Sequence, residues 1–204
     1  NYNVALGASA LGSNTTAANN VAVGHYALAA NTTGAGNIAI GKNSLDANTT
    51  GGTNTGVGHY ALSSNTTAGF NTGIGNAALQ TTTVGHSNTA VGSSSLNALT
   101  TGDFNVAVGY NAGLVMTTAD RNVAIGPESL DACTTGQYNV GMGSGALGSL
   151  TTADDNVAIG ISAGAAVTTG ANNVAMGRNA LAANTTAANN TAVGKDALGA
   201  NTTG

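Results

Sequence analysis

The residues that could carry chemistry are few: the chain holds three histidines, eight acidic residues and one cysteine. His25 and His59 are separated by 34 residues with Lys42 midway between them, and His86 stands apart from both. A nucleophilic triad needs a serine or cysteine beside a histidine and a carboxylate, and no recurring spacing brings such residues together. We therefore expect no catalytic residues and no enzyme activity.

Carboxylates offer a second kind of chemistry, because paired carboxylates hold Ca²⁺. Asp103, Asp120 and Asp154 are separated by multiples of 17 residues, so the first two could approach within about 5 Å if successive segments stack. Arg121 and solvent are simpler partners, and the glycine-rich calcium-binding nonapeptide is absent. His25 and His59 have poor metal geometry with Lys42 between them. We expect no metal and no cofactor.

Aromatic residues recur at an interval of 34 residues. Phe70, Phe104 and Tyr138 form one series to which Tyr2 also belongs, and Tyr26 and Tyr60 each follow a histidine. Two interpretations remain open: a duplication history in which rings cover a corner, or a ribbon of rings that stacks on glycans or docks a partner. Phe70, Phe104, Tyr138, Tyr26 and Tyr60 are the candidate ligand surface.

These residues are positioned by a repeat of 17 residues. Asparagine recurs at this interval from Asn3 to Asn190, without insertion or deletion, and defines position 1 of twelve repeats. The consensus is N-[VT]-A-[VI]-G-x-x-A-L-x-x-N-T-T-[GA]-x-x. We interpret residues 1–204 as one array, and as a window of a longer fibre, because Asn1 and Gly204 fall inside incomplete repeats.

The columns of the repeat predict an all-β parallel β-solenoid of twelve 17-residue coils. Positions 2 to 4 read as a short strand, and position 5 is always glycine, which indicates a positive φ or a close backbone approach. Seventeen residues are too few for two helices and a turn. We expect the Val or Ile at position 4 and the Leu at position 9 to be buried.

Variation between repeats also indicates which positions share the interior. Where position 9 is Gly113 or Gly164, position 12 changes from Asn to Met116 or Val167, as if one residue fills the space the other leaves. Cys133 stands at the same position 12, and we interpret it as a small buried hydrophobic residue.

Identical residues at one height of each coil would form ladders that fix the register. The structural ladder residues include Asn20 and Asn37 at position 1, Gly24 and Gly41 at position 5, and Thr32 and Thr49 at position 13. Of the adjacent threonines at positions 13 and 14, we expect one to point inward and one outward. The recurring N-T-T sequence matches the glycosylation sequon, but stacked ladders explain it without glycans.

Composition argues against two classes of partner. With four basic residues and a net charge of −4, the chain lacks the basic surface that nucleic acids or anionic membranes attract. It also has no apolar run long enough to cross a bilayer, so we expect no nucleic acid and no membrane insertion.

The segments N-V-A-V-G (20–24), N-I-A-I-G (37–41), N-V-A-I-G (122–126, 156–160) and N-V-A-M-G (173–177) carry a resemblance. They resemble the YadA-like head repeats of trimeric autotransporter adhesins and related repeats of bacteriophage tail fibres. The resemblance implies a left-handed β-roll, a homotrimer, and attachment to a host surface, matrix or glycan. Val21, Ala22, Val23 and Gly24 would then build the coil wall and the subunit contact. Coils of that family are usually shorter, and the N-T-T-G segment is an addition.

We therefore expect a non-enzymatic structural or adhesive fibre, assembled as a homotrimer or filament, that is extracellular, on a cell surface or on a virion. The alternative is an ice-binding solenoid, since regular threonine hydroxyls on a flat β-face can match a lattice. Adjacent threonines on opposite faces would make a narrower site than a Thr-x-Thr pattern.

Overall fold

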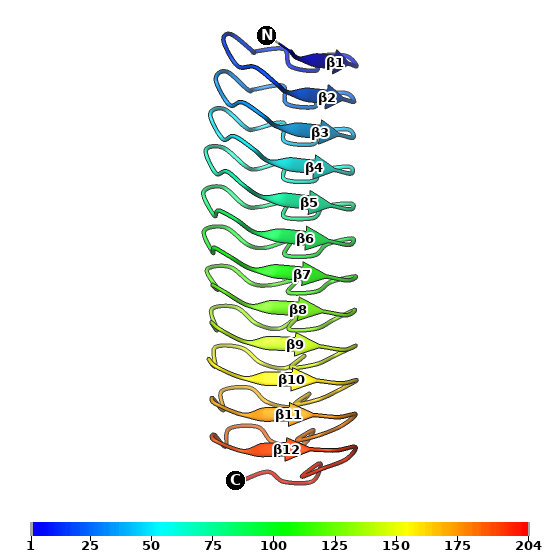
Figure 1. Ribbon diagram of the computed structural model, residues 1–204, viewed down its shortest axis with the longest axis vertical. Helices are drawn as coiled ribbons and strands as arrows, with labels where there is room; N and C mark the ends of the chain where they lie inside the picture. Colours follow the sequence, from blue (N-terminus) through cyan, green and yellow to red (C-terminus); the bar gives the residue numbers. More distant parts are fainter. Residues whose placement is uncertain (1, 204) are drawn as a thin grey trace.

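The computed structural model describes residues 2–203, which form twelve short strands in one parallel sheet. The strands follow one another in chain order down a narrow rod, one per coil (Figure 1). Their bounds are β1 (Val4–Leu6), β2 (Val21–Val23), β3 (Ile38–Ile40), β4 (Thr55–Val57), β5 (Thr72–Ile74), β6 (Thr89–Val91), β7 (Val106–Val108), β8 (Val123–Ile125), β9 (Val140–Met142), β10 (Val157–Ile159), β11 (Val174–Met176) and β12 (Thr191–Val193). The predicted parallel β-solenoid is confirmed. Asn1 and Gly204, on which the idea of incomplete repeats also rests, lie outside the described residues.

Each strand pairs in register with the strand one repeat later. In the pairing of β2 with β3, Val21 lies opposite Ile38 and Val23 lies opposite Ile40. Equivalent positions of the repeat therefore stack directly, about 4.8 Å apart. Residues 2–203 contain no helix, so the sheet and the turns between its strands are the whole framework.

The strands turn their small residue inward and their two larger residues outward. In β7, Ala107 is fully buried, whereas Val108 is 37% exposed on the outer face. The expectation that position 4 lies in the interior is therefore wrong. Successive strand residues face opposite sides, and because Asn105 at position 1 is buried, positions 2 and 4 must both face outward.

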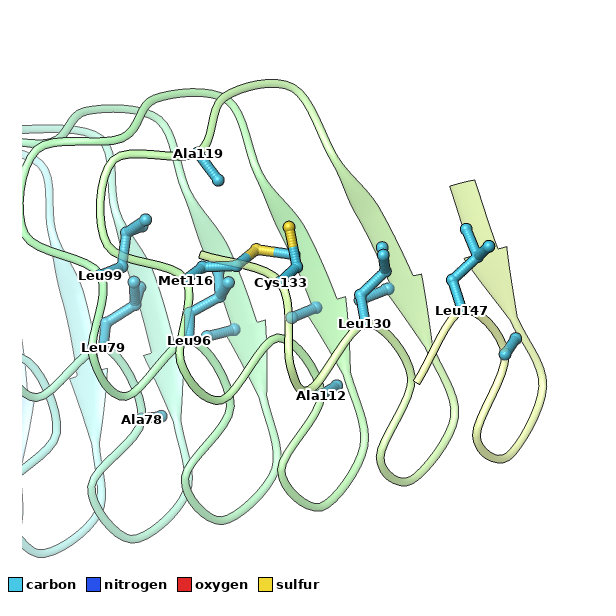
Figure 2. Packing of buried hydrophobic residues seen from close by; sticks show 14 of the residues in the cluster. Ala78, Leu79, Leu96, Leu99, Ala112, Met116, Ala119, Leu130, Cys133 and Leu147 are labelled. Carbon is cyan, nitrogen blue, oxygen red and sulfur yellow. The ribbon is translucent and has the colours of Figure 1, made fainter. Parts of the chain in front are cut away.

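The interior is filled by leucine at position 9, by position 12, and by small residues at positions 3 and 8. Leu79, Leu96 and Leu130 are fully buried, as are Leu99, Met116 and Cys133. Figure 2 shows the position 9 leucines in one row and Leu99, Met116 and Cys133 in a second row beside it. The core is therefore a narrow apolar column that runs along the rod instead of a globular centre.

Positions 9 and 12 share space in the way the sequence variation indicates. A Cβ atom added to Gly113 would lie 2.9 Å from Leu96 Cδ2 and 3.1 Å from Met116 Sδ. At Gly164 the corresponding neighbours are Leu147 Cδ2 at 2.9 Å and Val167 Cγ2 at 3.5 Å. Met116 and Val167 thus occupy part of the volume that a position 9 leucine would fill.

Position 5 requires glycine for two independent reasons. Gly41 has a φ of +130°, which side chains rarely adopt, and a Cβ atom there would lie 2.5 Å from the carbonyl oxygen of Gly58. Gly24 has the same relation to Gly41. The backbones of successive coils therefore meet at this corner at a distance that no side chain permits.

The asparagine at position 1 closes each coil and joins it to both neighbours. The backbone N–H of Asn37 donates to Asn20 Oδ1 at 2.8 Å, and Asn37 Nδ2 donates to the Gly51 carbonyl of its own coil at 2.8 Å. Asn37 Oδ1 in turn accepts the N–H of Asn54 at 2.9 Å. A fully buried side chain thus satisfies three polar groups that would otherwise be stranded in the core.

A second asparagine column stands at position 12 but covers only part of the rod. Asn48 Nδ2 donates to Asn31 Oδ1 at 2.9 Å, and Asn65 Nδ2 donates to Asn48 Oδ1 at 2.7 Å. The column then ends, because the next residue at this height is Thr82, and Asn65 Oδ1 is left buried without a hydrogen-bond partner. From Leu99 to Val167 the same column is apolar.

Three positions of the coil adopt left-handed backbone conformations. They are positions 7, 9 and 17, where φ lies near +55° in successive coils, as in Tyr26 (59°), Leu28 (50°) and Phe70 (62°). The leucines at position 9 are buried, so packing offsets the conformational cost. Positions 7 and 17 lie at the surface, and there the cost has no such compensation.

Candidate binding surface

The aromatic residues of position 17 lie on one exposed column together with Arg121. We call Phe70, Phe104, Arg121 and Tyr138 the aromatic ridge. Residues Phe70, Phe104 and Tyr138 are 67%, 54% and 49% exposed. Successive rings are two coils apart, about 9.6 Å from the inter-strand spacing. The structure therefore places these three predicted residues in one line on the rod surface.

Arg121 bridges the two rings that flank it, a role the sequence reasoning did not assign to it. Its guanidinium carbon lies 5.4 Å from the Phe104 ring centroid and 5.6 Å from that of Tyr138. Its Nη1 also donates to the Tyr138 hydroxyl at 3.4 Å. Cation–π contact on both sides holds Phe104, Arg121 and Tyr138 as a continuous strip over three coils.

The acidic residues beside the ridge bind backbone rather than one another. Asp103 Oδ1 accepts the N–H of His86 at 2.6 Å, and Asp120 Oδ1 accepts the N–H of Asp103 at 2.7 Å. Asp154 Oδ1 accepts the N–H of Gln137 at 2.7 Å. The position 16 carboxylates thus reach back one coil and fix their own orientation. Within residues 2–203 no three or more His, Cys, Asp or Glu side chains gather as a metal site.

His86 belongs to the same column and accepts a backbone hydrogen bond too. The N–H of Gly69 donates to His86 Nδ1 at 3.0 Å, which requires Nδ1 to be unprotonated. The sequence held no signal for these position 16 bonds beyond the presence of polar residues directly before a left-handed corner.

Tyr26 and Tyr60 lie at the other end of the strand, at position 7, away from the aromatic ridge. Each packs against the preceding histidine, with ring centroids 4.0 Å apart for His25 and Tyr26 and 4.1 Å apart for His59 and Tyr60. The ring planes are tilted by 55° and 41°. The candidate ligand surface of the sequence analysis therefore divides into two separate groups.

An extended apolar surface lies on the strand positions that the family resemblance assigned to the coil wall and the subunit contact. We call it the outer sheet face: positions 2 and 4 of β2 to β12. Its most exposed members expose more than a third of their surface: Ile38, Ile40, Ile74, Val108, Met142, Ile159, Met176 and Val193. Thr55, Thr72, Thr89 and Thr191 are its polar members at position 2. Apolar side chains thus run along the outside of the sheet over its whole length.

The two threonine columns differ in how they use their hydroxyls. At position 13, Thr32 Oγ1 donates to the Thr49 carbonyl at 3.0 Å, and Thr49 Oγ1 donates to the Thr66 carbonyl at 3.1 Å. These side chains are half-buried, whereas the position 14 threonines are exposed. One column therefore reinforces the stack, and the other faces solvent.

The sequon asparagines serve the interior. Asn31, Asn48, Asn65 and Asn184 are fully buried, and each donates from Nδ2 to a carbonyl three residues later in its own coil. A glycan on any of these amides would replace a hydrogen bond that closes the coil.

Burial perturbs three titratable groups outside the ridge. Desolvation raises the pKa of the fully buried Cys133 thiol to about 11. Desolvation also raises the pKa of Asp46 and of Asp131, both at position 10, against the opposing effect of backbone hydrogen bonds. Asp46 and Asp131 lie five coils apart in one column, and Cys133 is buried in the core at position 12, so the three groups do not converge on a site.

The surface of residues 2–203 has no pocket, so any ligand would bind an open face. No helix among these residues is long and apolar enough to cross a membrane. No protein-family model matches the chain, and comparisons with curated proteins and with solved structures found no match either. The chain's own surface features are therefore the guide to its function.

Proposed function

We propose that this chain is a non-enzymatic structural fibre for surface attachment, which assembles as a homotrimer through its outer sheet face. The observation that carries the proposal is the continuous apolar column at position 4, half-buried or exposed in every coil, with Val or Ile beside it at position 2 in most coils. An apolar strip of this length is unusual on a soluble monomer and is typical of an interaction surface. Burying it would add stability that a single chain lacks.

The repeat spacing favours a second copy of the same chain as the partner. The outer sheet face presents one pair of side chains per coil, in register from β2 to β12. Only a surface with the same spacing can match it along its length, and another copy has that spacing by construction. Closed cyclic assembly would bury the face on every protomer equally.

The trimer and its location follow from the resemblance to adhesin heads and phage tail fibres. Twelve coils at about 4.8 Å give a rod roughly 55 to 60 Å long, so the fibre supplies reach, and several copies supply multivalent contact. An extracellular position, on a cell or a virion, fits this role. The net charge of −4 gives no reason to propose nucleic acid or anionic lipid as a partner.

The threonine columns support ice binding less well than the outer sheet face supports a fibre. The position 13 hydroxyls donate to the next coil, and the single exposed column at position 14 is interrupted by Val84. A lattice-matching face needs several parallel rows of free hydroxyls. Thermal hysteresis at micromolar protein would favour ice binding over the fibre.

Sedimentation equilibrium of the isolated chain tests the proposal. We expect a trimer for the parent chain and a folded monomer for the Ile74→Asp, Val108→Asp double variant, because each substitution places a charge in the interface without entering the core. Thr101→Asp, on the exposed position 14 column, is the matched control and should remain trimeric. A folded parent chain that stays monomeric at a concentration about 100 times the Kd of a tight homo-oligomer would refute the proposed assembly.

A further inference from the structure

The aromatic ridge holds bulky residues where the fold favours small polar ones. Phe70, Phe104 and Tyr138 have φ values of 62°, 58° and 58°. The same corner in the other described coils is Asn19, Gly36, Thr53, Ser87, Arg121, Asp155, Asn172 or Asn189. Asparagine and glycine adopt this conformation readily, and a large side chain adopts it at a cost. Each aromatic residue is also about half exposed or more, so packing does not repay that cost.

The buried leucines of position 9 show how packing can offset the cost of a left-handed backbone conformation. Leu62 has a φ of 54° and is fully buried, so its strain supports the core. The ridge aromatics have the same kind of backbone conformation without the burial. Backbone strain that is not offset by packing in the core is found mainly at functional positions.

The spacing of the rings indicates the geometry of a ligand. The rings are two coils apart, about 9.6 Å, in a straight line set by the in-register stacking of the coils. In a β-1,4-linked glycan, consecutive sugars are turned over, so every second sugar presents the same face. The spacing of alternate coils is close to that of alternate sugars in such a chain.

Polar groups with a fixed orientation flank the rings. Asp103, Asp120 and Asp154 each use Oδ1 for a backbone N–H, and Oδ2 of each has no hydrogen-bond partner among the described residues. Arg121 is held between two rings. Free carboxylate oxygens and guanidinium N–H groups beside apolar ring faces are the groups that sugar hydroxyls and sugar faces require.

The charge of the surface selects among glycans. Asp103, Asp120, Asp154 and Asp155 surround the ridge, and Arg121 is the one Lys or Arg at positions 16 and 17 of the described coils. An acidic polysaccharide would meet this excess of negative charge, whereas a neutral one would not.

We propose that the aromatic ridge binds an extended, neutral β-1,4-linked glycan, with alternate sugars stacked on Phe70, Phe104 and Tyr138. The proposal rests on the attachment role above and gives it a ligand class. The chain runs parallel to the rod axis, and the position 16 carboxylates accept hydrogen bonds from its hydroxyls. A rigid platform of this kind binds without ordering a loop.

Calorimetric titration with cellohexaose and with chitohexaose tests this site on the assembled protein. We expect binding of at least one of these probes, and at least about ten-fold weaker binding by Phe104→Asn, Tyr138→Asn, equal to about 1.4 kcal/mol. Because asparagine is native to this corner, the melting temperature of that variant should be unchanged or higher. Tyr26→Asn, Tyr60→Asn is the matched control, and it should bind like the parent chain.

Four outcomes would overturn the site: no binding of either probe, equal loss in the ridge and control variants, preference for alginate over both probes, or a fall in melting temperature that accompanies the lost binding. Sedimentation of the same samples separates this proposal from the fibre proposal. A trimer that binds neither probe refutes the glycan site alone, and a monomer that binds refutes the trimer alone.

Discussion

A Cβ atom on Gly41 would lie 2.5 Å from the carbonyl oxygen of Gly58, and Gly41 has a φ of +130°. Gly41→Ala must therefore separate two coils as well as adopt a strained backbone. We expect it to lower the free energy of unfolding by roughly 3 kcal/mol, measured by urea denaturation.

Gly145→Ala is the matched control for that substitution. Gly145 also has a positive φ, but a Cβ atom there would come no closer than 4.0 Å to any neighbour, Ser162 Oγ. Ala77 already stands at the same position with a φ of 55°. We expect a loss of about 1 kcal/mol, and equal losses for the two variants would show that backbone contact at position 5 is unimportant.

The Asn88 side chain supports the stack through buried hydrogen bonds. Its Nδ2 donates to the Gly102 carbonyl at 2.8 Å, and its Oδ1 accepts the N–H of Asn105 at 2.9 Å. Asn88→Ala leaves both groups buried and unpaired, so we expect a loss of about 2 to 4 kcal/mol in the free energy of unfolding. Asn97→Ala, at the half-buried position 10, should lose less than about 1 kcal/mol. The reverse ranking in urea denaturation would contradict the ladder's role.

Gly113 and Met116 should be energetically coupled, because a Cβ atom on Gly113 would lie 3.1 Å from Met116 Sδ. Gly113→Leu alone overfills the core, whereas Gly113→Leu, Met116→Cys restores the pair found in the next coil, Leu130 and Cys133. We expect a favourable coupling energy of about 1 to 3 kcal/mol in a double-mutant cycle. Additive effects would mean that the two positions do not share space.

Cys133 should make stability depend on alkaline pH. Burial raises the pKa of this thiol from 9.0 to about 11, so the folded chain retains a proton that the unfolded chain loses. Its contribution is complete below pH 9 and is lost as the pH rises toward 11, by roughly 3 kcal/mol at most. Cys133→Val, with the residue found at Val167, should remove this part of the pH dependence of denaturant unfolding. An identical pH profile in the variant would assign the dependence to other groups.

The 17-residue period, its strand-like positions 2 to 4 and its invariant glycine were together enough to predict the solenoid, because so short a repeat leaves no room for two helices and a turn. They could not decide which side of a three-residue strand faces inward. A strand such as Val106-Ala107-Val108 alternates in the same way for either orientation, and side-chain size favoured the wrong one. The choice is made by Asn105, whose amide must reach carbonyls inside the coil, and by Leu96, which fills the space that valines would need.

The site was predictable in part for a similar reason. The 34-residue interval placed Phe70, Phe104 and Tyr138 in one column, since stacked coils convert sequence interval into height. The interval could not reveal that Arg121 lies between two rings, or that Asp103 binds the backbone of the preceding coil. Those contacts depend on side-chain direction at a left-handed corner, which residue spacing does not encode.

The hydrogen bonds between coils join each coil to its immediate neighbours, as the Asn20, Asn37 and Asn54 side chains do. A pull along the rod therefore loads all coils in series, and the weakest junction yields first. Each released coil would lengthen the chain by about 60 Å at full extension, so force spectroscopy should record a series of equal steps. The rod would thereby absorb mechanical work coil by coil while the remaining coils stay intact.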